Sequence, residues 1–180
     1  NRVSRTKHIW SFNLQLSQIN LNYLNLTIRR ATISISYCNY GMYCTSVGSP
    51  VLMHSGADML YHGHFSNCSN AAIYIDSPDS GTGQFVLDGT ILEYNQGFGI
   101  FIENFLGAGN PLELRNVWFE GNHTSETVDV AGATYTPRDL YLRNVSQGKI
   151  YGTVISSVEI ISSDLIFEQC KSFGAQYFAI

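Results

Sequence analysis

The chain has 180 residues and a formal net charge of −4; 44% of its residues are hydrophobic and only 13% are charged. This apolar, charge-poor composition excludes a disordered chain, and the lack of a basic run argues against a nucleic-acid partner. No stretch approaches the 18 consecutive apolar residues of a membrane-spanning helix. The chain begins without Met and ends in the apolar run "AQYFAI". We therefore expect a single domain, residues 1–180, cut from a longer chain.

A four-residue pattern recurs along the sequence: a large apolar residue, then Glu or Ser, then a variable residue, then Asn or Cys. It reads ISYC at 35–38, FSNC at 65–68, LEYN at 92–95, FEGN at 119–122 and FEQC at 167–170. The copies that begin at Phe65, Leu92 and Phe119 follow one another at intervals of 27 residues. A displaced copy, VSQG at 145–148, is expected because "LYLRNV" (140–145) repeats "LELRNV" (112–117). A repeat of this length indicates a solenoid.

Inside each repeat the residues follow a period of two: Leu112 and Leu114 alternate with Glu113 and Arg115, and Phe85 and Leu87 alternate with Val86 and Asp88. This is the period of a β-strand. A second apolar stretch follows a turn rich in Gly and Asn, as in 71–76 and 97–104, and no segment has the period and caps of a helix. We predict an all-β chain of about six coils of about 22 to 30 residues, stacked at the strand spacing of about 4.8 Å. The predicted coils lie near 22–45, 52–76, 84–104, 111–131, 138–155 and 158–180.

The repeat assigns a place to each of its residues. The first points into the core: Ile35, Phe65, Leu92, Phe119, Val145 and Phe167. The second points outward. The fourth lies at a corner, where Asn adopts a left-handed backbone and its side chain hydrogen-bonds to the next coil. Cysteine also occupies this corner, and we expect the four cysteines of the chain to be buried free thiols.

Two carboxylates stand at the outward place of adjacent coils, Glu93 and Glu120. Stacked strands would hold them about 5 Å apart, which is the separation that retaining glycosidases use. Trp118 is expected to face outward beside this pair, where it suits the apolar face of a sugar ring. The alternative is that both carboxylates are simply solvated and that Trp118 packs against another chain of an oligomer.

Asp88, Arg115 and Arg143 align on the preceding strand of their coils, and Tyr141 is expected to face outward from the same strand. This row is either a surface ion-pair ladder, with Asp88 bridging Arg115, or a pair of guanidinium groups that binds a sugar carboxylate. In the second case the substrate would be a uronic acid and the reaction an elimination. Its base would be one of Tyr61, His62, His64 and His123.

We expect no metal and no cofactor. Asp76 and Asp79 are carboxylates in or beside a loop that could hold Ca²⁺, but two carboxylates in a polar loop are usually only solvated.

The ladder of four-residue patterns and the paired "LELRNV" and "LYLRNV" resemble the right-handed parallel β-helix of phage tailspikes and of pectate-lyase-like enzymes. The resemblance covers essentially the whole chain but includes no motif specific to one activity. "HGHF" at 62–65 is not the Gly-His-Gly of the polygalacturonases. The resemblance favours the phage branch, and it implies a homotrimer, located on the virion or outside the cell, that binds and often cleaves a bacterial surface polysaccharide.

The leading hypothesis is therefore a polysaccharide depolymerase that hydrolyses glycosidic bonds. Its catalytic residues would be Glu93 and Glu120, and its substrate-binding residues Trp118, Arg115, Arg143 and Tyr141. The alternatives are a lyase that acts on a uronic-acid-containing glycan, and a glycan-binding adhesin or structural β-helix without catalysis.

Overall fold

The structure, a computed structural model, describes residues 19–20, 34–45, 58–61, 63–76, 85–106 and 112–172; at 19–20, 44–45, 58–61 and 172 it describes the backbone alone. These residues form 19 β-strands and no helix. The all-β prediction is confirmed for this part of the chain. None of its elements is a helix with the length and apolarity needed to cross a membrane.

Seventeen of the strands belong to three parallel sheets. Sheet A contains β1 (Ile19–Asn20), β3 (Tyr40–Thr45), β6 (Ala71–Asp76), β9 (Phe98–Glu103), β14 (Leu140–Arg143) and β17 (Val158–Ile161). Sheet B contains β2 (Ser34–Ser36), β5 (His64–Ser66), β8 (Ile91–Glu93), β11 (Trp118–Glu120), β16 (Val154–Ile155) and β19 (Lys171–Ser172). Sheet C contains β4 (Asp58–Tyr61), β7 (Phe85–Asp88), β10 (Leu112–Arg115), β15 (Gly148–Tyr151) and β18 (Leu165–Glu168).

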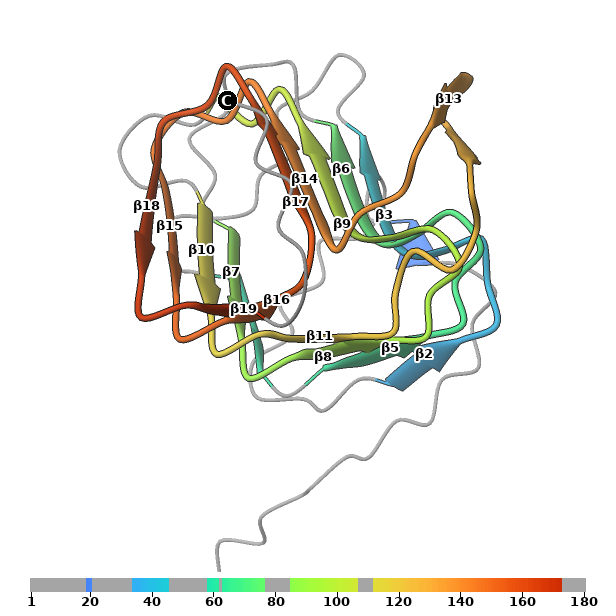
Figure 1. The fold of residues 1–180 in the computed structure, drawn as a ribbon, viewed down its shortest axis with the longest axis horizontal. Helices are drawn as coiled ribbons and strands as arrows, with labels where there is room; N and C mark the ends of the chain where they lie inside the picture. The colour runs from blue at the N-terminus through green and yellow to red at the C-terminus, as the bar shows by residue number, and fades with distance from the viewer. Residues whose placement is uncertain are drawn as a thin grey trace, which may run out of the picture.

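From β2 onward the chain passes from sheet B to sheet A to sheet C and back to sheet B (Figure 1). We call one such passage through the three sheets a coil. Within these three sheets each strand that is not at a sheet end pairs in parallel with the strand one coil before it and the strand one coil after it. This arrangement of stacked parallel sheets is compatible with a parallel β-helix.

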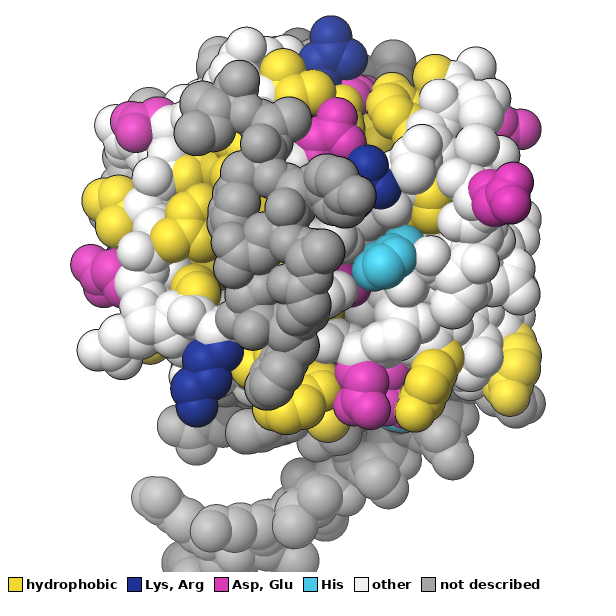
Figure 2. Space-filling view, in the orientation of Figure 1, with side chains coloured by type: hydrophobic (Ala, Val, Ile, Leu, Met, Phe, Trp, Pro, Cys, Tyr) yellow, Lys and Arg dark blue, Asp and Glu magenta, His cyan; other side chains and the backbone are white. Residues whose placement is uncertain are grey.

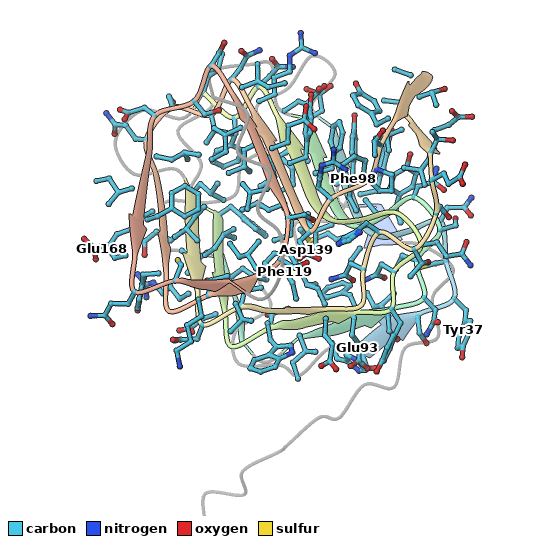
Figure 3. The ribbon with its side chains drawn as sticks, viewed as in Figure 1. Tyr37, Glu93, Phe98, Phe119, Asp139 and Glu168 are labelled. Carbon is cyan, nitrogen blue, oxygen red and sulfur yellow. The ribbon has the colours of Figure 1, made fainter. Side chains whose placement is uncertain are left out.

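The main core lies in the space that the three sheets enclose. In Figure 3, Phe119 lies on the inner side of sheet B, whereas Glu93 points away from it. Ile35, Phe65, Leu92 and Phe119 pair in register on β2, β5, β8 and β11, and all four are buried. Burying each such side chain contributes roughly 1.5 to 3 kcal/mol. The predicted inward row is therefore confirmed for these four coils.

The row continues differently from the prediction. In the next coil the strand that pairs with β11 is β16, whose Val154 lies opposite Trp118. Val145 is buried but precedes β15 in a corner, and Phe167 lies in sheet C, where it pairs with Ile150 and is 37% exposed. Val145 and Phe167 were wrongly aligned because the length of the repeat changes after β11. A hairpin is inserted there, and the coil that follows is short.

A residue with a left-handed backbone follows most strands and turns the chain into the next sheet. At the corner between sheets B and A this residue is Tyr37, Asn67, Tyr94 or Gly121, with φ between 52° and 62°. The left-handed residue is thus the third of the repeat. The prediction that the fourth residue has this conformation is wrong. A left-handed conformation costs most residues about 1 to 2 kcal/mol, so the corners at Tyr37 and Tyr94 carry a strain that the stacking of coils offsets.

The fourth residue of the repeat instead points inward and links one coil to the next. Asn95 Nδ2 donates to Asn122 Oδ1 at 2.7 Å, and Asn95 Oδ1 accepts from the backbone N–H of Cys68 at 2.9 Å. Both Asn side chains are buried. In the earlier coils Cys38 and Cys68 take this place as buried free thiols, with their sulfur atoms 3.4 Å apart. The predicted hydrogen bonding from coil to coil is confirmed.

A second, smaller hydrophobic cluster lies on the outer face of sheet A. An antiparallel hairpin of β12 (Val128–Val130) and β13 (Ala133–Tyr135) extends from the corner after β11 and covers part of this face (Figure 1). The cluster consists of Ala71, Tyr74, Phe98, Phe101, Val128, Val130 and Tyr141, with Tyr40, Tyr43, Tyr135 and Ile161 at its border. Phe98 is labelled between the sheet and the hairpin in Figure 3. The outer face of sheet A is therefore covered by packed aromatic rings where the hairpin lies over it, and it is not solvated there.

Candidate functional site

Glu93 and Glu120 lie in register on β8 and β11, on the outer face of sheet B, as predicted. Adjacent strands hold paired residues about 5 Å apart. Glu93 Oε1 lies 2.8 Å from His64 Nε2 of the preceding coil, and Glu120 Oε2 accepts from Trp118 Nε1 at 3.0 Å. Each carboxylate is thus oriented by its own neighbour, and neither hydrogen-bonds to the other in the described structure.

A row of larger side chains runs beside the carboxylates. His64, Ile91 and Trp118 pair in register on β5, β8 and β11. Ile91 and Trp118 are more than two-fifths exposed, as expected for an outward place between buried neighbours. Figure 2 shows hydrophobic and acidic side chains side by side along the lower edge of the view, where Figure 1 places sheet B.

Two exposed tyrosines extend this face into the corner next to sheet A. Tyr37 is 81% exposed and Tyr94 is 53% exposed, and both have a left-handed backbone, with φ of 58° and 52°. The equivalent places in the other coils are taken by Asn67 and Gly121, residue types that tolerate this conformation. Tyr37 and Tyr94 therefore place exposed aromatic rings at backbone positions that bulky residues rarely adopt.

Gly121 makes room for Tyr94. A Cβ atom on Gly121 would lie 2.9 Å from Cδ1 of the Tyr94 ring, so the ring lies over the backbone of the next coil, beside Glu120. Tyr37, Tyr94 and Gly121 are not among the residues predicted for the site. The available signal was the third letter of the repeat, which reads Tyr, Asn, Tyr and Gly in successive coils.

The predicted pairing of Arg115 with Arg143 is wrong. Arg115 lies on β10 in sheet C, where it pairs with Asp88 and Tyr151, whereas Arg143 lies on β14 in sheet A, opposite Glu103. The two similar segments "LELR" and "LYLR" were aligned with each other because strands in all three sheets have the same two-residue alternation. Nothing in that period distinguishes one sheet from another.

The salt bridges of this region also differ from the prediction. The Arg115 guanidinium contacts the carboxylate of Glu113, two residues earlier on the same strand, and Nε donates at 2.7 Å. Asp88 is in register with Arg115 as predicted, but its Oδ1 accepts from Asn116 Nδ2 at 3.2 Å. Asp88 therefore does not bridge to Arg115 by a hydrogen bond or ion pair in the described structure.

Tyr141 lies on the outer face of sheet A, but it is not available as a sugar platform. Its ring is buried and stacks on Phe101, with 4.4 Å between ring centroids. Tyr135 of the hairpin packs against it edge-on. Burial and the Glu103 carboxylate raise the pKa of Tyr141 to about 12. The prediction that Tyr141 is exposed to substrate is wrong because the inserted hairpin covers it.

The four residues named as bases are not gathered at one place. His64 lies on the outer face of sheet B with Glu93, whereas His123 lies in the corner between sheets B and A, with Nε2 4.0 Å from Asp139 Oδ1. His62 and the side chain of Tyr61 lie outside the described residues, as does Asp79. Within the described ranges no group of three or more His, Cys, Asp or Glu side chains is placed to hold a metal ion.

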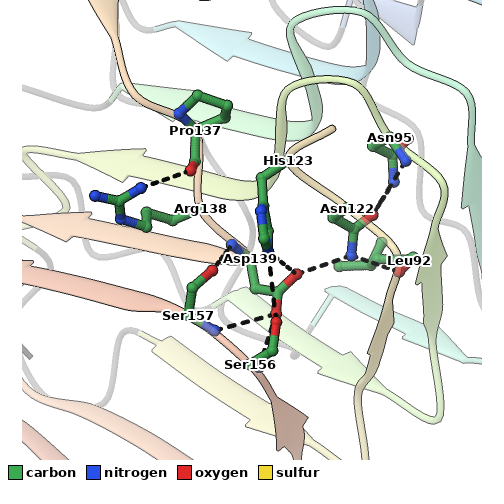
Figure 4. A network of polar contacts seen from close by, with 9 residues as sticks. All are labelled: Leu92, Asn95, Asn122, His123, Pro137, Arg138, Asp139, Ser156 and Ser157. Atoms are coloured by element: carbon green, nitrogen blue, oxygen red, sulfur yellow. Dashed lines mark hydrogen bonds and ion pairs between the residues drawn. The ribbon is translucent and has the colours of Figure 1, made fainter. Parts of the chain in front are cut away.

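His123, Asp139 and Ser156 form a polar network that superficially suggests a hydrolase triad (Figure 4); Asp139 is buried, whereas His123 and Ser156 are partly exposed. Ser156 Oγ donates to Asp139 Oδ2 at 2.5 Å and lies 3.4 Å from His123 Nε2. The same ring nitrogen, Nε2, faces both partners, whereas a triad uses one nitrogen for the serine and the other for the carboxylate. This arrangement therefore does not relay a proton in the manner of a triad.

Asp139 instead completes the ladder of corner side chains. Its carboxylate is 1% exposed and accepts from Asn122 Nδ2 and from the backbone N–H groups of Ser156 and Ser157 (Figure 4). A buried carboxylate needs such donors, because an unpaired one would be strongly destabilising. We assign Asp139 a structural role at the corner that follows the hairpin.

One arrangement of charged residues was not anticipated. Asp76, Glu103 and Arg143 lie in register on β6, β9 and β14. Burial raises the pKa of Glu103, and the Asp76 carboxylate adds to this effect while Arg143 opposes it. The signal was present in the sequence: "IYID", "IFIE" and "LYLR" end equivalent strands of sheet A. It was missed because "LYLR" had been aligned with "LELR".

Comparison of the chain with protein-family models, with curated proteins and with solved structures gave no match in any of the three. The interpretation of the site therefore depends on its own geometry.

Proposed function

We propose that this chain is part of a right-handed parallel β-helix of the phage tailspike type, and that it binds and hydrolyses a bacterial surface polysaccharide on the outer face of sheet B. The observation that carries the proposal is the register pair Glu93 and Glu120, flanked by the exposed rings of Trp118 and Tyr94. Paired carboxylates supply acid–base or nucleophilic chemistry, and exposed aromatic faces match the apolar faces of sugar rings.

The spacing of stacked strands, about 4.8 Å, favours a retaining reaction over an inverting one, which needs carboxyl groups about 6.5 to 9.5 Å apart. Glu93, oriented by His64 at 2.8 Å, is the proposed nucleophile. It attacks the anomeric carbon while Glu120 gives a proton to the leaving glycosidic oxygen. Water then hydrolyses the glycosyl–enzyme ester, with Glu120 acting as base, and both carboxyl groups return to their initial state.

The uronate lyase is less well supported than the hydrolase. It required two arginines on neighbouring coils to neutralise the sugar carboxylate, and Arg115 and Arg143 lie in different sheets. A histidine beside the face remains as its base, since His64 contacts Glu93. The non-catalytic adhesin is supported by Tyr37 and Tyr94, which would bind sugar rings whether or not the carboxylates react.

The test is a reducing-end assay on purified capsular and O-antigen polysaccharides from a panel of bacterial strains, with ultraviolet absorbance recorded for unsaturated uronate. The hydrolase predicts new reducing ends without that absorbance. Glu120→Gln should reduce turnover at least 100-fold, a typical contribution of a general acid. The matched control is Glu168→Gln, an exposed carboxylate on β18 in sheet C, which should retain full turnover.

Each other outcome selects a different function. Binding of a polysaccharide without release of reducing ends would support the adhesin, and release with the absorbance of an unsaturated product would support the lyase. Equal turnover of Glu120→Gln and the unaltered protein would refute the carboxylate pair. The tailspike resemblance also implies a homotrimer, which light scattering would reveal as three times the chain mass.

A further inference from the structure

Cys38 and Cys68 are stacked at the corner between sheets B and A, in the consecutive coils that begin with β2 and β5. Their Sγ atoms lie 3.4 Å apart although the residues are 30 positions apart in the chain, and both side chains are buried. Each takes the fourth place of the repeat, directly after the left-handed Tyr37 or Asn67. The fold therefore brings two oxidisable groups into direct contact.

The backbone on both sides of the two thiols is held in register. Ser36 pairs with Ser66 on β2 and β5. Beyond the thiols, the Ser69 N–H donates to the Cys38 carbonyl at 2.8 Å. Adjacent strands hold such positions about 5 Å apart, and disulfide-bonded cysteines have Cα atoms roughly 4.4 to 6.8 Å apart. A bond between Cys38 and Cys68 therefore needs a movement of the side chains and no shift of the backbone.

The corner side chains of the later coils show what the cysteine pair lacks. Asn95 donates to Asn122 at 2.7 Å, and Asn95 Oδ1 accepts from the Cys68 N–H at 2.9 Å. Between Cys38 and Cys68 the described side chains offer only a contact of two sulfur atoms, and thiols are weak donors and acceptors. A covalent bond would give this pair of coils the strong link that the amides give the later ones.

Cys38 is the thiol at which oxidation would begin. It is 8% exposed, whereas Cys68 is fully buried. Hydrogen bonding to Cys68 lowers the pKa of Cys38, while contact with Cys38 and burial raise the pKa of Cys68. The thiolate is the form that attacks a disulfide, so Cys38 is the residue that reacts first and Cys68 is the residue that completes the bond.

We propose that Cys38 and Cys68 form an oxidation site, at which exchange with a low-molecular-weight disulfide of the glutathione class cross-links two consecutive coils. The Cys38 thiolate attacks one sulfur of the small disulfide, so a mixed disulfide forms and one small thiol leaves. The Cys68 thiol then loses its proton and attacks the Cys38 sulfur, which releases the second small thiol. The cysteine pair gives up two electrons and the small disulfide accepts them. The site does not depend on hydrolysis at sheet B.

The cross-link would stabilise the coils that carry β2 to β5. It closes a loop that contains β3, β4 and β5, and such a bond restricts the unfolded chain more than the folded one. The alternative is that the two thiols only fill the corner. In that case they react only after the protein unfolds, when all four cysteines of the chain are equally accessible.

The test is incubation of the full chain with oxidised glutathione, followed by digestion without reduction and mass spectrometry. We expect one cross-linked peptide pair, which joins Cys38 to Cys68, and a melting temperature higher by about 5 °C or more. Dithiothreitol should reverse both changes. The same reaction in concentrated urea should give mixed pairs that include Cys44 and Cys170. A native protein without the Cys38–Cys68 peptide, or with Cys44 or Cys170 in its place, would overturn the proposal.

Two variants test the order of the steps. Cys68→Ala lacks the second thiol, so glutathione should remain on Cys38 as a mixed disulfide. Cys38→Ala should leave the fully buried Cys68 unmodified. The matched control is Cys170→Ser, which removes a thiol whose Sγ donates to the Ile150 carbonyl, and it should cross-link as fully as the unaltered protein. Glutathione on Cys68 but not on Cys38 would refute the order, and a cross-link that leaves the melting temperature unchanged would refute the stabilising role. Peptide mapping of the unaltered protein decides the pairing even if a variant fails to fold.

Discussion

Asn95 donates from Nδ2 to Oδ1 of Asn122 at 2.7 Å, between two buried side chains at the same corner of successive coils. Asn122 in turn donates to the Leu92 carbonyl at 2.8 Å and to Asp139 Oδ1 at 3.1 Å. This single amide therefore satisfies groups in its own coil and in the preceding one. Because buried polar groups are costly when unpaired, we expect the corner to be a major source of cooperativity between coils.

Asn122→Ala should lower the free energy of unfolding by about 3 kcal/mol, since it leaves the Asn95 amide, the Leu92 carbonyl and one Asp139 oxygen with fewer partners. Urea denaturation followed by circular dichroism measures this change. The control is Gln96→Ala at an exposed place in the same corner, for which the change should stay within about 0.5 kcal/mol. Similar losses in the two variants would contradict the ladder.

Two glycines should be destabilised to very different extents by an added methyl group. A Cβ on Gly97 would lie 1.8 Å from the carbonyl oxygen of Asn70, in the backbone of the preceding coil, so Gly97→Ala should cost more than about 4 kcal/mol or prevent folding. Gly132, in the hairpin turn, has φ of +84° but open space around it. Gly132→Ala should cost only about 1 kcal/mol, from backbone strain. Thermal melts of the two variants compare the steric clash at Gly97 with the backbone strain at Gly132. Equal melting temperatures would disprove the close contact between Gly97 and the Asn70 carbonyl.

Stability should fall as pH rises through the region where Glu103 ionises. Burial raises the pKa of Glu103 in the folded protein above the usual value of 4.5, so the folded state holds this proton more tightly than the unfolded state. The contribution is fully present below the unfolded pKa and is lost as pH rises through the folded pKa. Urea midpoints measured from pH 4 upward should show the fall, and Glu103→Gln should reduce it. An unchanged pH profile in Glu103→Gln would mean that another group causes the fall.

Tyr94→Asn should separate binding from folding. Asn tolerates the left-handed backbone that Tyr94 adopts, and Asn67 occupies the same place one coil earlier. The free energy of unfolding should change by less than about 1 kcal/mol. Affinity for the polysaccharide found in the reducing-end assay should fall about tenfold, which corresponds to about 1.4 kcal/mol. A large loss of stability with unchanged affinity would show that Tyr94 serves the corner and not the ligand.

Much of the architecture was predictable because each coil meets the same physical demands. The inward row Ile35 to Phe119, the outward pair Glu93 and Glu120 and the buried Asn ladder all follow from a two-residue period read at a regular spacing. The prediction failed after Phe119, where the inserted hairpin and a shortened coil break that spacing. From that point Val145, Phe167 and Arg143 were assigned to the wrong rows.

The sequence alone determined that this protein is all-β, that Phe119 faces inward and that Glu120 faces outward above Glu93, because alternation and repeat length are local properties of the chain. Only the tertiary structure decided which strands share a sheet. It placed Arg143 beside Glu103 and not beside Arg115, and it buried Tyr141 under the hairpin. The reason is that strands in all three sheets have the same period, so their assignment depends on corner lengths and on long-range packing.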